Sequence, residues 1–474
     1  MEEWAKSWLI EQRREGKKGI EVKEIGNNYY VYHSTTYWDK ELKKRRKVSE
    51  YIGKLDRVKG LVKGIKRSIT ATNLRGIKEY GNAVLFDRLL GEMRSCLANA
   101  FDDEWEEIYA LAITRAIGYT PLKRVRSAWD KLYNISQINP NLDAKNLSHV
   151  LKVVGSDSRA QESVFKALSE KDRDLVYDLS TILTRSSLNI AEYGYNKDKI
   201  HVPQVNIALF CSLETGLPTM IRTIPGSVRD IKSLYNSIIE VKKEGGTIVL
   251  DRGFFSEDAI KFLLEKNMNF VLPARRNSRL YDTRIHLNDH LFYHKRLIRC
   301  GKRKVDGTFL YLFEDQHLVL EENTTLYRKL EEVKIDKQEL SEAQKRVGKI
   351  LIVSNLDLDE KEIFMQYKSR DRIEKLFDTY KNVLQADMLY LQDNESVFGH
   401  IFVSFLSLYA YTKIEMALKK ADLLNKLSPK DVLFELGKVY LIELIDCNII
   451  SEIPKKLERL DEKLGLELFP KNRS

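Results

Sequence analysis

The sequence predicts an α/β fold built around one mixed sheet. Three strand-like segments follow one another after residue 173, namely DLVYDLSTIL, VNIALFCSLETG and LPTMIRTIPG. Thr215-Gly216 marks a hairpin between the last two. Helices and strands then alternate as VRDIKSLYNSIIEVKKEG, TIVLD, SEDAIKFLLEKN and NFVLPA. Consecutive strands favour antiparallel pairing and alternation with helices favours parallel pairing, so we expect a sheet with one half of each kind.

Two regions precede this sheet. Residues 20–55 are predicted to form short strands followed by a basic helix. From about residue 60 to 170, apolar side chains recur at spacings of three and four, which is typical of amphipathic helices. We therefore expect a small basic β/α region at 1–60 and a helical domain at 61–170. A chain of 474 residues is long enough for two to four domains.

The α/β alternation is interrupted at 275–348. There the segment DHLFYHKRLIRCGKRKVDGTFLYLFEDQHLVL reads as additional strands with turns. The strand GKILIVSN and a long helix then resume the pattern. We predict a core in two parts, 171–274 and 349–420, separated by a strand-rich insertion at 275–348 and followed by a C-terminal helical region at 421–474.

The net charge of +10 is concentrated near the N-terminus. Residues 1–67 contain 18 Lys/Arg and 10 Asp/Glu, a difference of +8. The densest run, KELKKRRK at 40–47, follows the tyrosine-rich YYVYHSTTYW at 29–38. Basic residues beside aromatic ones suit contact with phosphates and sugars, although a solvated surface is the ordinary alternative. We expect four residues of the run to bind DNA: Lys43, Lys44, Arg45 and Arg46.

Several other classes of protein fit the sequence poorly. The four cysteines are far apart and form no C-x2-C pair, which argues against a zinc ribbon and for reduced thiols in a cytoplasmic setting. The N-terminal segment lacks the apolar stretch of a signal peptide. The longest apolar run, 397–412, contains His400 and several hydroxyl groups and is short for a membrane span. We expect a buried core helix there and no membrane partner.

Two aspartates follow apolar strand segments. Asp178 ends the string LVY, and Asp251 ends TIVL and precedes Arg252-Gly253-Phe254. A buried carboxylate is costly unless it is paired or bound to a metal, and the ends of strands in α/β sheets face the functional crevice. The ordinary alternative for both is a turn or a helix N-cap. Asp172 and Asp174 compete with Asp178 but precede the apolar run.

A third acid lies in the pattern Y-x2-R-x3-E-x6-K, formed by Tyr367, Arg370, Glu374 and Lys381. On one regular helix these side chains would lie within roughly 60° of one another, along about four turns. The alternative is a solvated helix face with mixed charges. Three carboxylates that converge on one point can hold two Mg²⁺ ions for an in-line phosphoryl displacement.

These motifs resemble those of the DDE transposases of prokaryotic insertion sequences, specifically the insertion-sequence-four superfamily. The resemblance rests on Asp178-Leu179-Ser180, on Asp251-Arg252-Gly253-Phe254 and on the complete Y-x2-R-x3-E-x6-K motif. It covers about residues 174–415 and implies a ribonuclease-H-like catalytic core. It also implies that Asp178, Asp251 and Glu374 bind two catalytic Mg²⁺ ions, for which Mn²⁺ can substitute.

The resemblance further implies contacts with DNA. Arg370 and Lys381 would contact phosphates near the cut, Tyr367 would position the terminal nucleotides, and we add Arg252 as a DNA contact. Some relatives stack a Trp of the insertion on a flipped base. This insertion contains no Trp, so either another aromatic residue stacks or no hairpin step occurs; the candidates are Phe292, Tyr293, Phe309 and Tyr311.

The sequence therefore predicts a transposase that cleaves the ends of its element and joins the 3′-hydroxyls to target DNA. We expect double-stranded DNA as partner, a homodimer in the active complex and a location in the cytoplasm at the nucleoid. Two alternatives stay open. One is a DNA-binding relative without catalysis, and the other is a ribonuclease-H-like nuclease without strand transfer.

Overall fold

The computed structural model forms two compact units. One comprises Met1–Arg75 with Leu444–Cys447, and the other comprises Gly76–Glu443 with Asn448–Ser474. The structure describes the following residues: 1–26, 28–39, 44–63, 73–170, 172–194, 196, 200–228, 234–237, 245–332, 334–387 and 389–470. Most of the predicted helix VRDIKSLYNSIIEVKKEG lies outside them.

The N-terminal unit is a helix packed on a four-stranded antiparallel sheet of order β1-β2-β3-β4. Its elements are α1 (Glu3–Arg14), β1 (Ile20–Ile25), β2 (Asn28–Asp39), β3 (Lys44–Asp56) and β4 (Gly60–Lys63). A small core of its own includes Ala5, Tyr29, Val31 and Leu55. The unit contains the predicted strands, whereas α1, which precedes them, was not predicted.

The predicted basic helix of this unit is wrong, because its residues form strand β3. β3 pairs with β2 along most of its length, from Leu55 opposite Tyr29 to Lys44 opposite Asp39. The ring of Tyr51 on β3 packs on Tyr30 and Tyr32 of β2, at centroid distances of 6.2 and 5.5 Å. Cross-strand aromatic pairs of this kind stabilise a sheet and override the helix propensity of the Lys/Arg run.

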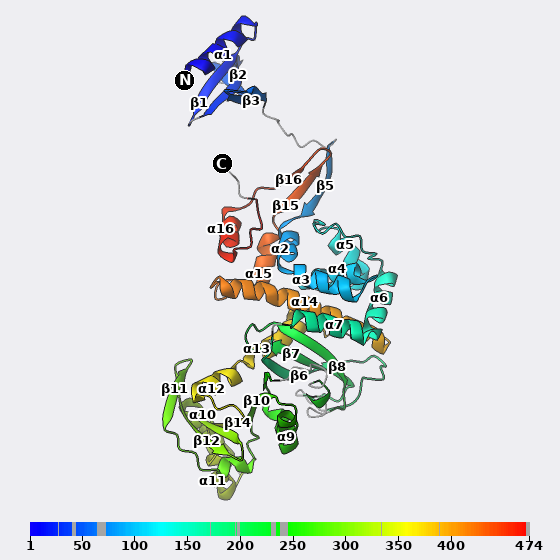
Figure 1. The fold of residues 1–474 in the computed structure, drawn as a ribbon, viewed down its shortest axis with the longest axis vertical. Coiled ribbons are helices and arrows are strands. Elements are labelled where there is room, and N and C mark those ends of the chain that lie inside the picture. The colour runs from blue at the N-terminus through cyan, green and yellow to red at the C-terminus, as the bar shows by residue number, and fades with distance from the viewer. Residues whose placement is uncertain are drawn as a thin grey trace. The chain divides into compact units, whose positions relative to one another are not determined.

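The larger unit contains a nine-stranded mixed sheet of order β11-β12-β13-β14-β10-β9-β6-β7-β8 (Figure 1). Its core strands are β6 (Leu175–Leu183), β7 (Gln204–Ser212), β8 (Pro218–Pro225), β9 (Thr247–Val249) and β10 (Asn269–Pro273). β6, β7 and β8 pair antiparallel, whereas β6, β9 and β10 pair parallel. The predicted division of the sheet is confirmed, as is the hairpin at Gly216, whose φ of +78° suits glycine.

The insertion extends this sheet. Its strands β11 (Asp289–Tyr293), β12 (Arg296–Val305) and β13 (Thr308–Asp315) pair in turn, and β13 pairs antiparallel with β14 (Lys349–Ser354). The expected strand at QHLVL is wrong, because α10 (Gln316–Glu331) begins there. The carboxylate of Asp315 accepts hydrogen bonds from the backbone N–H groups of His317 and Leu318, which caps that helix. A second helix, α11 (Lys337–Gln344), follows.

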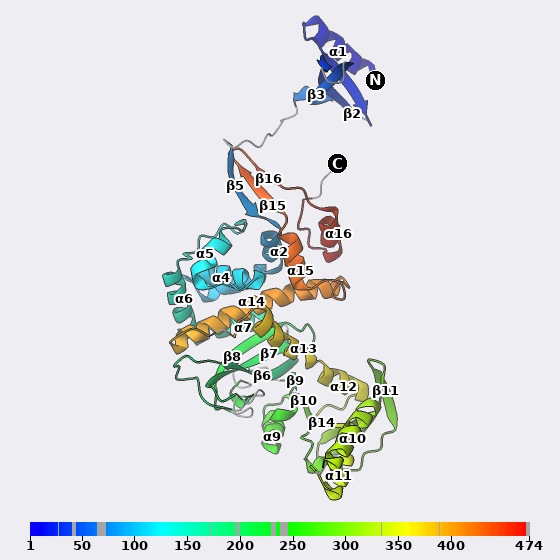
Figure 2. The same ribbon diagram turned by 180° about the vertical axis from the view of Figure 1, so that it is seen from behind.

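Helices cover the other end of the larger unit (Figure 2). They are α2 (Gly81–Leu89), α3 (Gly91–Ala100), α4 (Trp105–Ile117), α5 (Leu122–Trp129), α6 (Ala144–Ser156) and α7 (Ser158–Leu168). The long helix α14 (Asn394–Lys420) contacts α4 and α6 as well as β8, and so joins the helices to the sheet in one core. After α14 the chain forms α15 (Pro429–Leu436), β15 (Tyr440–Leu444), β16 (Asn448–Ile450) and α16 (Lys455–Leu464). The strands β15 and β16 form a three-stranded sheet with β5 (Leu74–Glu79), which precedes α2.

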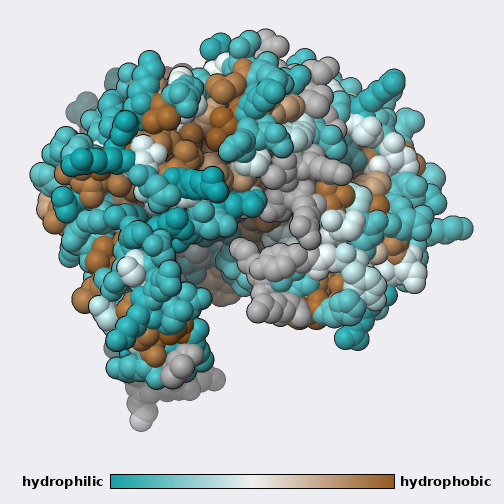
Figure 3. Space-filling model, turned by 90° about the horizontal axis from the view of Figure 1, so that it is seen from below, coloured by the Kyte–Doolittle hydropathy of each residue, from teal (hydrophilic) through white to brown (hydrophobic). Residues whose placement is uncertain are grey.

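Helix α14 is the predicted apolar helix. Among the described residues it is the one helix long and apolar enough to cross a membrane, but 78% of its most apolar window is buried inside the protein. Its side chains are therefore those of a core helix, as expected. On the face shown in Figure 3, hydrophilic side chains predominate and apolar ones are interspersed among them, which is ordinary for a protein surface.

Candidate active site

Two aspartates lie at neighbouring parallel strands of the sheet, Asp178 within β6 and Asp251 just after β9. Val176 of β6 pairs with Val249 of β9, and Asp178 and Asp251 each lie two residues further along. The register therefore places both at the same level, at the carboxyl end of the parallel half, where α/β proteins bind ligands. The prediction that Asp178 ends its strand is wrong. β6 continues beyond it because its other edge stays paired with β7, where Asp178 is opposite Leu209.

Arg370 joins the second aspartate to the glutamate. Its Nη1 lies 2.6 Å from Oδ1 of Asp251, and its Nη2 lies 2.9 Å from Oε1 of Glu374. The guanidinium is the more buried partner, with 18% of its side chain exposed against 37% for Asp251 and 52% for Glu374. The two carboxylates are thus held on either side of one planar cation, which can bond both at once.

The first aspartate contributes to the same electrostatic centre. Burial of Arg370 by itself lowers its pKa, but the nearby charges of Asp251, Tyr367, Glu374 and Asp178 outweigh burial and raise it. Asp178 also accepts a hydrogen bond of 2.8 Å from the backbone N–H of Leu179. Two carboxylates therefore pair with the guanidinium, and a third, that of Asp178, is near enough to add to its electrostatic environment.

The helix that carries Arg370 and Glu374 is not the continuous helix predicted from the motif. α12 (Glu360–Lys368) ends before Arg370, which is the N-cap of α13 (Asp371–Asp378). The i→i+3 hydrogen bonds from Arg370 N to Tyr367 O and from Ile373 N to Arg370 O tighten the chain between them. After α13 the chain widens into a π-helix, η3 (Thr379–Val383). The four motif residues consequently do not share one regular stripe.

The comparison with protein families covers the region that contains these acids. Residues 169–410 match the family described as the transposase DDE domain, which is 242 of the 474 residues. The chain belongs to this family. The match begins just before β6 and ends within α14, and so contains all three acids. The insertion falls inside the DDE domain as well.

Other comparisons add less. A cryo-EM structure of a piggyBac transposase synaptic complex with hairpin DNA is similar to this chain over 83% of its length and 85% of the other chain. Sequence identity is 11% and the TM-score is 0.42. No curated protein matches the chain.

Lys381 of the DDE domain contacts the sheet. Its Nζ donates a hydrogen bond of 2.6 Å to the backbone carbonyl of Thr181, on the same strand as Asp178. This bond fixes the π-helix against β6 close to the acids. A π-helical turn inside an α-helical segment is frequent at functional sites, because the extra residue redirects the following side chains. The predicted contact of Lys381 with DNA phosphate stays a prediction.

Tyr367 and Arg252 are the two remaining residues predicted to contact DNA near the acids. Only 8% of Tyr367 is exposed, burial raises its pKa, and its ring lies 6.0 Å from the guanidinium carbon of Arg370. The ring thus supports Arg370 from the protein interior. Arg252 follows Asp251 in a short 3₁₀ turn, and its buried Nε has no hydrogen-bond partner in the described part of the chain. Neither position tests the expected DNA contacts.

Two arginines that the sequence analysis missed hold the site in place. Nη1 of Arg372 donates to the carbonyls of Leu213 and Glu214, which ties α13 to the turn between β7 and β8. Nη2 of Arg275 donates to the carbonyl of Gly253, which fixes the turn after Asp251. Neither residue has a sequence signal of its own, because each bonds backbone carbonyls that only the fold brings near.

The donor set suits Mg²⁺, because carboxylate oxygens are its preferred protein ligands. Within the described residues, no group of three or more acidic, His or Cys side chains is close enough to hold a metal ion as the side chains stand. Arg370 explains this, since it already occupies the space between Asp251 and Glu374. Asp251 and Glu374 are separated by this guanidinium, and their oxygens are of the donor type that a divalent cation takes.

The insertion offers one exposed aromatic side chain among the four predicted stacking candidates. Phe292 is 67% exposed, whereas Phe309 and Tyr311 are buried. The hydroxyl of Tyr311 bonds the carbonyls of Leu356 and Leu358, and the ring of Tyr293 packs on Phe364. Burial removes Phe309 and Tyr311 as stacking residues, so Phe292 is the best placed of the four.

The predicted basic DNA contacts of the N-terminal unit lie on strand β3. Lys44, Arg45 and Arg46 are exposed there, opposite Asp39, Trp38 and Tyr37 of β2. Lys43 lies outside the described residues. An exposed basic strand beside Tyr37 and Trp38, which are 49% and 58% exposed, keeps the charge and aromatic character that favoured DNA contact.

We expect Arg370→Gln to lower stability in the absence of divalent metal by about 1 kcal/mol, because Asp251 and Glu374 lose the cation between them. Mg²⁺ should stabilise this variant more than the wild-type DDE domain, since metal no longer competes with the guanidinium. Thermal unfolding with EDTA and with Mg²⁺ measures both effects. Lys375→Gln, an exposed charge change on the same helix, is the control. Equal responses to Mg²⁺ in wild type and Arg370→Gln would contradict a shared site.

Proposed function

We propose that this chain is a Mg²⁺-dependent DNA transposase of the insertion-sequence-four superfamily. It would cleave the ends of an insertion sequence and join the freed 3′-hydroxyls to target DNA. The observation that carries the proposal is the pairing of Asp251 and Glu374 with one guanidinium, that of Arg370, within a DDE domain, with Asp178 on the neighbouring strand. Three antiparallel strands followed by two parallel ones support a ribonuclease-H-like core.

In this mechanism Asp178, Asp251 and Glu374 would hold the two Mg²⁺ ions. Bound there, such ions would supply activation of the attacking water or 3′-hydroxyl and charge stabilisation at the leaving oxygen. Arg370, displaced from between Asp251 and Glu374, would bind a phosphate oxygen beside the cut with the same two nitrogens. Tyr367 would restrict its movement from behind, because its ring lies against the guanidinium.

The other parts of the chain have supporting roles in the proposal. Lys381 and Arg252 would contribute positive charge near the scissile phosphate, and the exposed basic strand β3 would bind the DNA backbone away from the cut. Cutting two ends in one complex favours a homodimer. The protein would act on double-stranded DNA in the cytoplasm, at the nucleoid.

The test is a cleavage assay on DNA that carries the inverted repeats flanking the reading frame. We expect end cleavage and strand joining with Mg²⁺ or Mn²⁺, and neither with EDTA. DNA binding should weaken steeply between 50 and 200 mM salt, by about 10³-fold if roughly six phosphates are neutralised. Cleavage without joining would replace the proposal with a nuclease, and binding without cleavage in any metal would replace it with a DNA-binding relative.

A further inference from the structure

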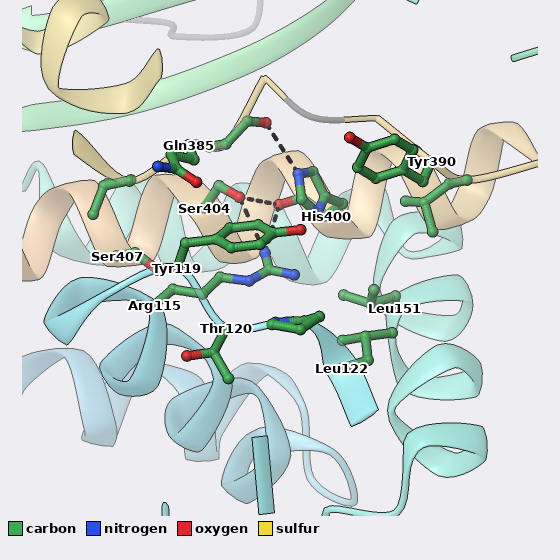
Figure 4. A pocket seen from close by; sticks show the side chains of 14 residues that line it. Arg115, Tyr119, Thr120, Leu122, Leu151, Gln385, Tyr390, His400, Ser404 and Ser407 are labelled. Carbon is green, nitrogen blue, oxygen red and sulfur yellow. Dashed lines mark hydrogen bonds between the residues drawn. The ribbon is translucent and has the colours of Figure 1, made fainter. Parts of the chain in front are cut away.

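A pocket separate from the three acids lies on the helical side of the larger unit (Figure 4). Its volume is about 200 Å³. Its walls come from the end of α4 and the residues after it, from α6, from α14, and from the segment that follows the π-helix η3. One side of the pocket therefore continues directly from the turn that carries Lys381.

Arg115 of α4 forms the floor of this pocket. Only 8% of the residue is exposed. Its Nη1 donates to the carbonyl of His400 at 3.4 Å and to Oγ of Ser404 at 3.1 Å, both on α14. Figure 4 shows another guanidinium nitrogen pointing away from these bonds into the pocket. In the part of the chain that the structure describes, no carboxylate forms an ion pair with Arg115.

Among the described residues, Arg115 differs in this respect from several partly buried arginines. Three other partly buried arginines each pair with an acid: Arg222 with Glu162, Arg276 with Glu322, and Arg370 with Asp251 and Glu374. A buried charge without a counter-charge is strongly disfavoured. Burial lowers the pKa of Arg115 to about 10, which leaves the guanidinium charged at neutral pH.

The neighbouring histidine does not add or remove charge. Burial, assisted by the charge of Arg115, lowers the pKa of His400 to about 3, so its imidazole is neutral near pH 7. Its Nε2 is hydrogen-bonded to the carbonyl of Ala386 at 3.0 Å. The hydroxyl of Ser404 donates to the carbonyl of His400 and accepts from Arg115, so the floor of the pocket offers an oxyanion the single positive charge of Arg115.

The mouth of the pocket is aromatic. Tyr119 and Tyr390 are 44% and 75% exposed and stand at the rim, and the side chains of Leu122 and Leu391 line the wall below them. Exposed tyrosine rings at the entrance of a cationic pocket offer flat surfaces on which a base can stack. Inorganic phosphate has no ring that could stack on these tyrosines, whereas a nucleotide has both a phosphate and a flat base.

We propose that this pocket binds the phosphate group of a nucleotide, with Arg115 bonding the phosphate oxygens and Tyr119 and Tyr390 contacting the base. The nucleotide can be free or part of an unpaired DNA strand, since both present the same chemistry. The site does not depend on catalysis by the three acids. Its occupancy and the proposed function are therefore tested separately.

The test is a titration of the full chain with three ligands: inorganic phosphate, deoxyadenosine monophosphate and a short single-stranded oligonucleotide. Isothermal calorimetry gives the affinities, and chloride is adjusted to keep the ionic strength constant. We expect Arg115→Met to weaken all three ligands at least about tenfold, the loss that follows from removing a charge-assisted hydrogen bond. Arg124→Met removes the same charge from an exposed position nearby and should change each affinity less than about twofold.

Thermal unfolding separates binding from a purely structural role. The wild type should be stabilised by phosphate, and Arg115→Met should lose this response while remaining as stable as the ligand-free wild type, because an unpaired buried charge has been removed. Tyr390→Ala, at an exposed site, should weaken the mononucleotide but not inorganic phosphate. If Arg115→Met binds like the wild type, or Tyr390→Ala leaves nucleotide affinity unchanged, the proposal is overturned. Tighter binding of the oligonucleotide than of the mononucleotide assigns the site to a DNA strand, and the reverse assigns it to a free nucleotide.

Discussion

Asp178→Ala, Asp251→Ala and Glu374→Ala should each reduce DNA strand cleavage at least about a thousandfold. Each substitution removes one of the three carboxylates proposed to hold the metal ions, two of which pair with Arg370 in the structure. A metal pair supplies several kcal/mol to a phosphoryl displacement, and each 1.36 kcal/mol corresponds to a factor of ten in rate. The measurement is the initial rate of cleavage on DNA with the flanking repeats, at saturating Mg²⁺.

DNA binding by these variants should change little, because the acids carry negative charge and repel phosphate. Asp378→Ala is the matched control. Asp378 is exposed at the end of α13, where it accepts a hydrogen bond from Asn382, one turn beyond Glu374. The substitution Asp378→Ala removes the same charge from the same helix without removing a contact of Arg370. A variant of Asp178, Asp251 or Glu374 that cleaves at the wild-type rate would remove that residue from the site, whereas equal loss in Asp378→Ala would indicate a general effect of charge on α13.

The mixed sheet and the place of Asp251 after a strand could be predicted because their signals are local. A strand that ends in a carboxylate after an apolar run is recognisable in isolation, and Asp251 after TIVL is such a case. The division of the sheet follows from the order of strands and helices along the chain. Parallel pairing of β6 with β9 then places Asp178 beside Asp251 without further information.

The links between the acids could not be predicted in the same way. The spacing of Tyr367, Arg370, Glu374 and Lys381 aligns them only on a regular helix, whereas the chain tightens before Arg370 and widens at η3. Which acid Arg370 bonds depends on the position of β9, more than a hundred residues earlier. The strand β3 was misjudged for a similar reason, since its partner β2 determines its conformation.

The burial of Arg115 could not be predicted from the sequence at all. In the sequence it is one basic residue within an otherwise apolar helix, ALAITRAI, and nothing nearby distinguishes it from an arginine that reaches solvent. Its burial arises from packing against α14, which lies 285 residues away at His400. The absence of a carboxylate beside it is likewise a property of the fold.

The packing of α14 makes the second strong prediction, which concerns stability. Gly155 of α6 and Gly399 of α14 face each other where the two helices cross. A Cβ at Gly155 would lie 1.7 Å from the carbonyl oxygen of Glu395, and a Cβ at Gly399 would lie 1.9 Å from that of Leu151. Both obstacles are helix backbone, which cannot rotate away. The helices pack this closely only because neither position has a side chain.

We therefore expect Gly155→Val and Gly399→Val each to lower the free energy of unfolding by about 3 kcal/mol or more, measured by urea denaturation. Gly91→Ala is the control, because its Cβ would meet nothing within 4 Å at the start of α3, and it should be neutral or slightly stabilising. The double variant should lose less than the sum, since separating the helices once relieves both contacts. Gly399 precedes His400, whose carbonyl accepts from Arg115, so the same separation should also abolish stabilisation by phosphate. Wild-type stability in either valine variant would show that α6 and α14 do not cross in backbone contact.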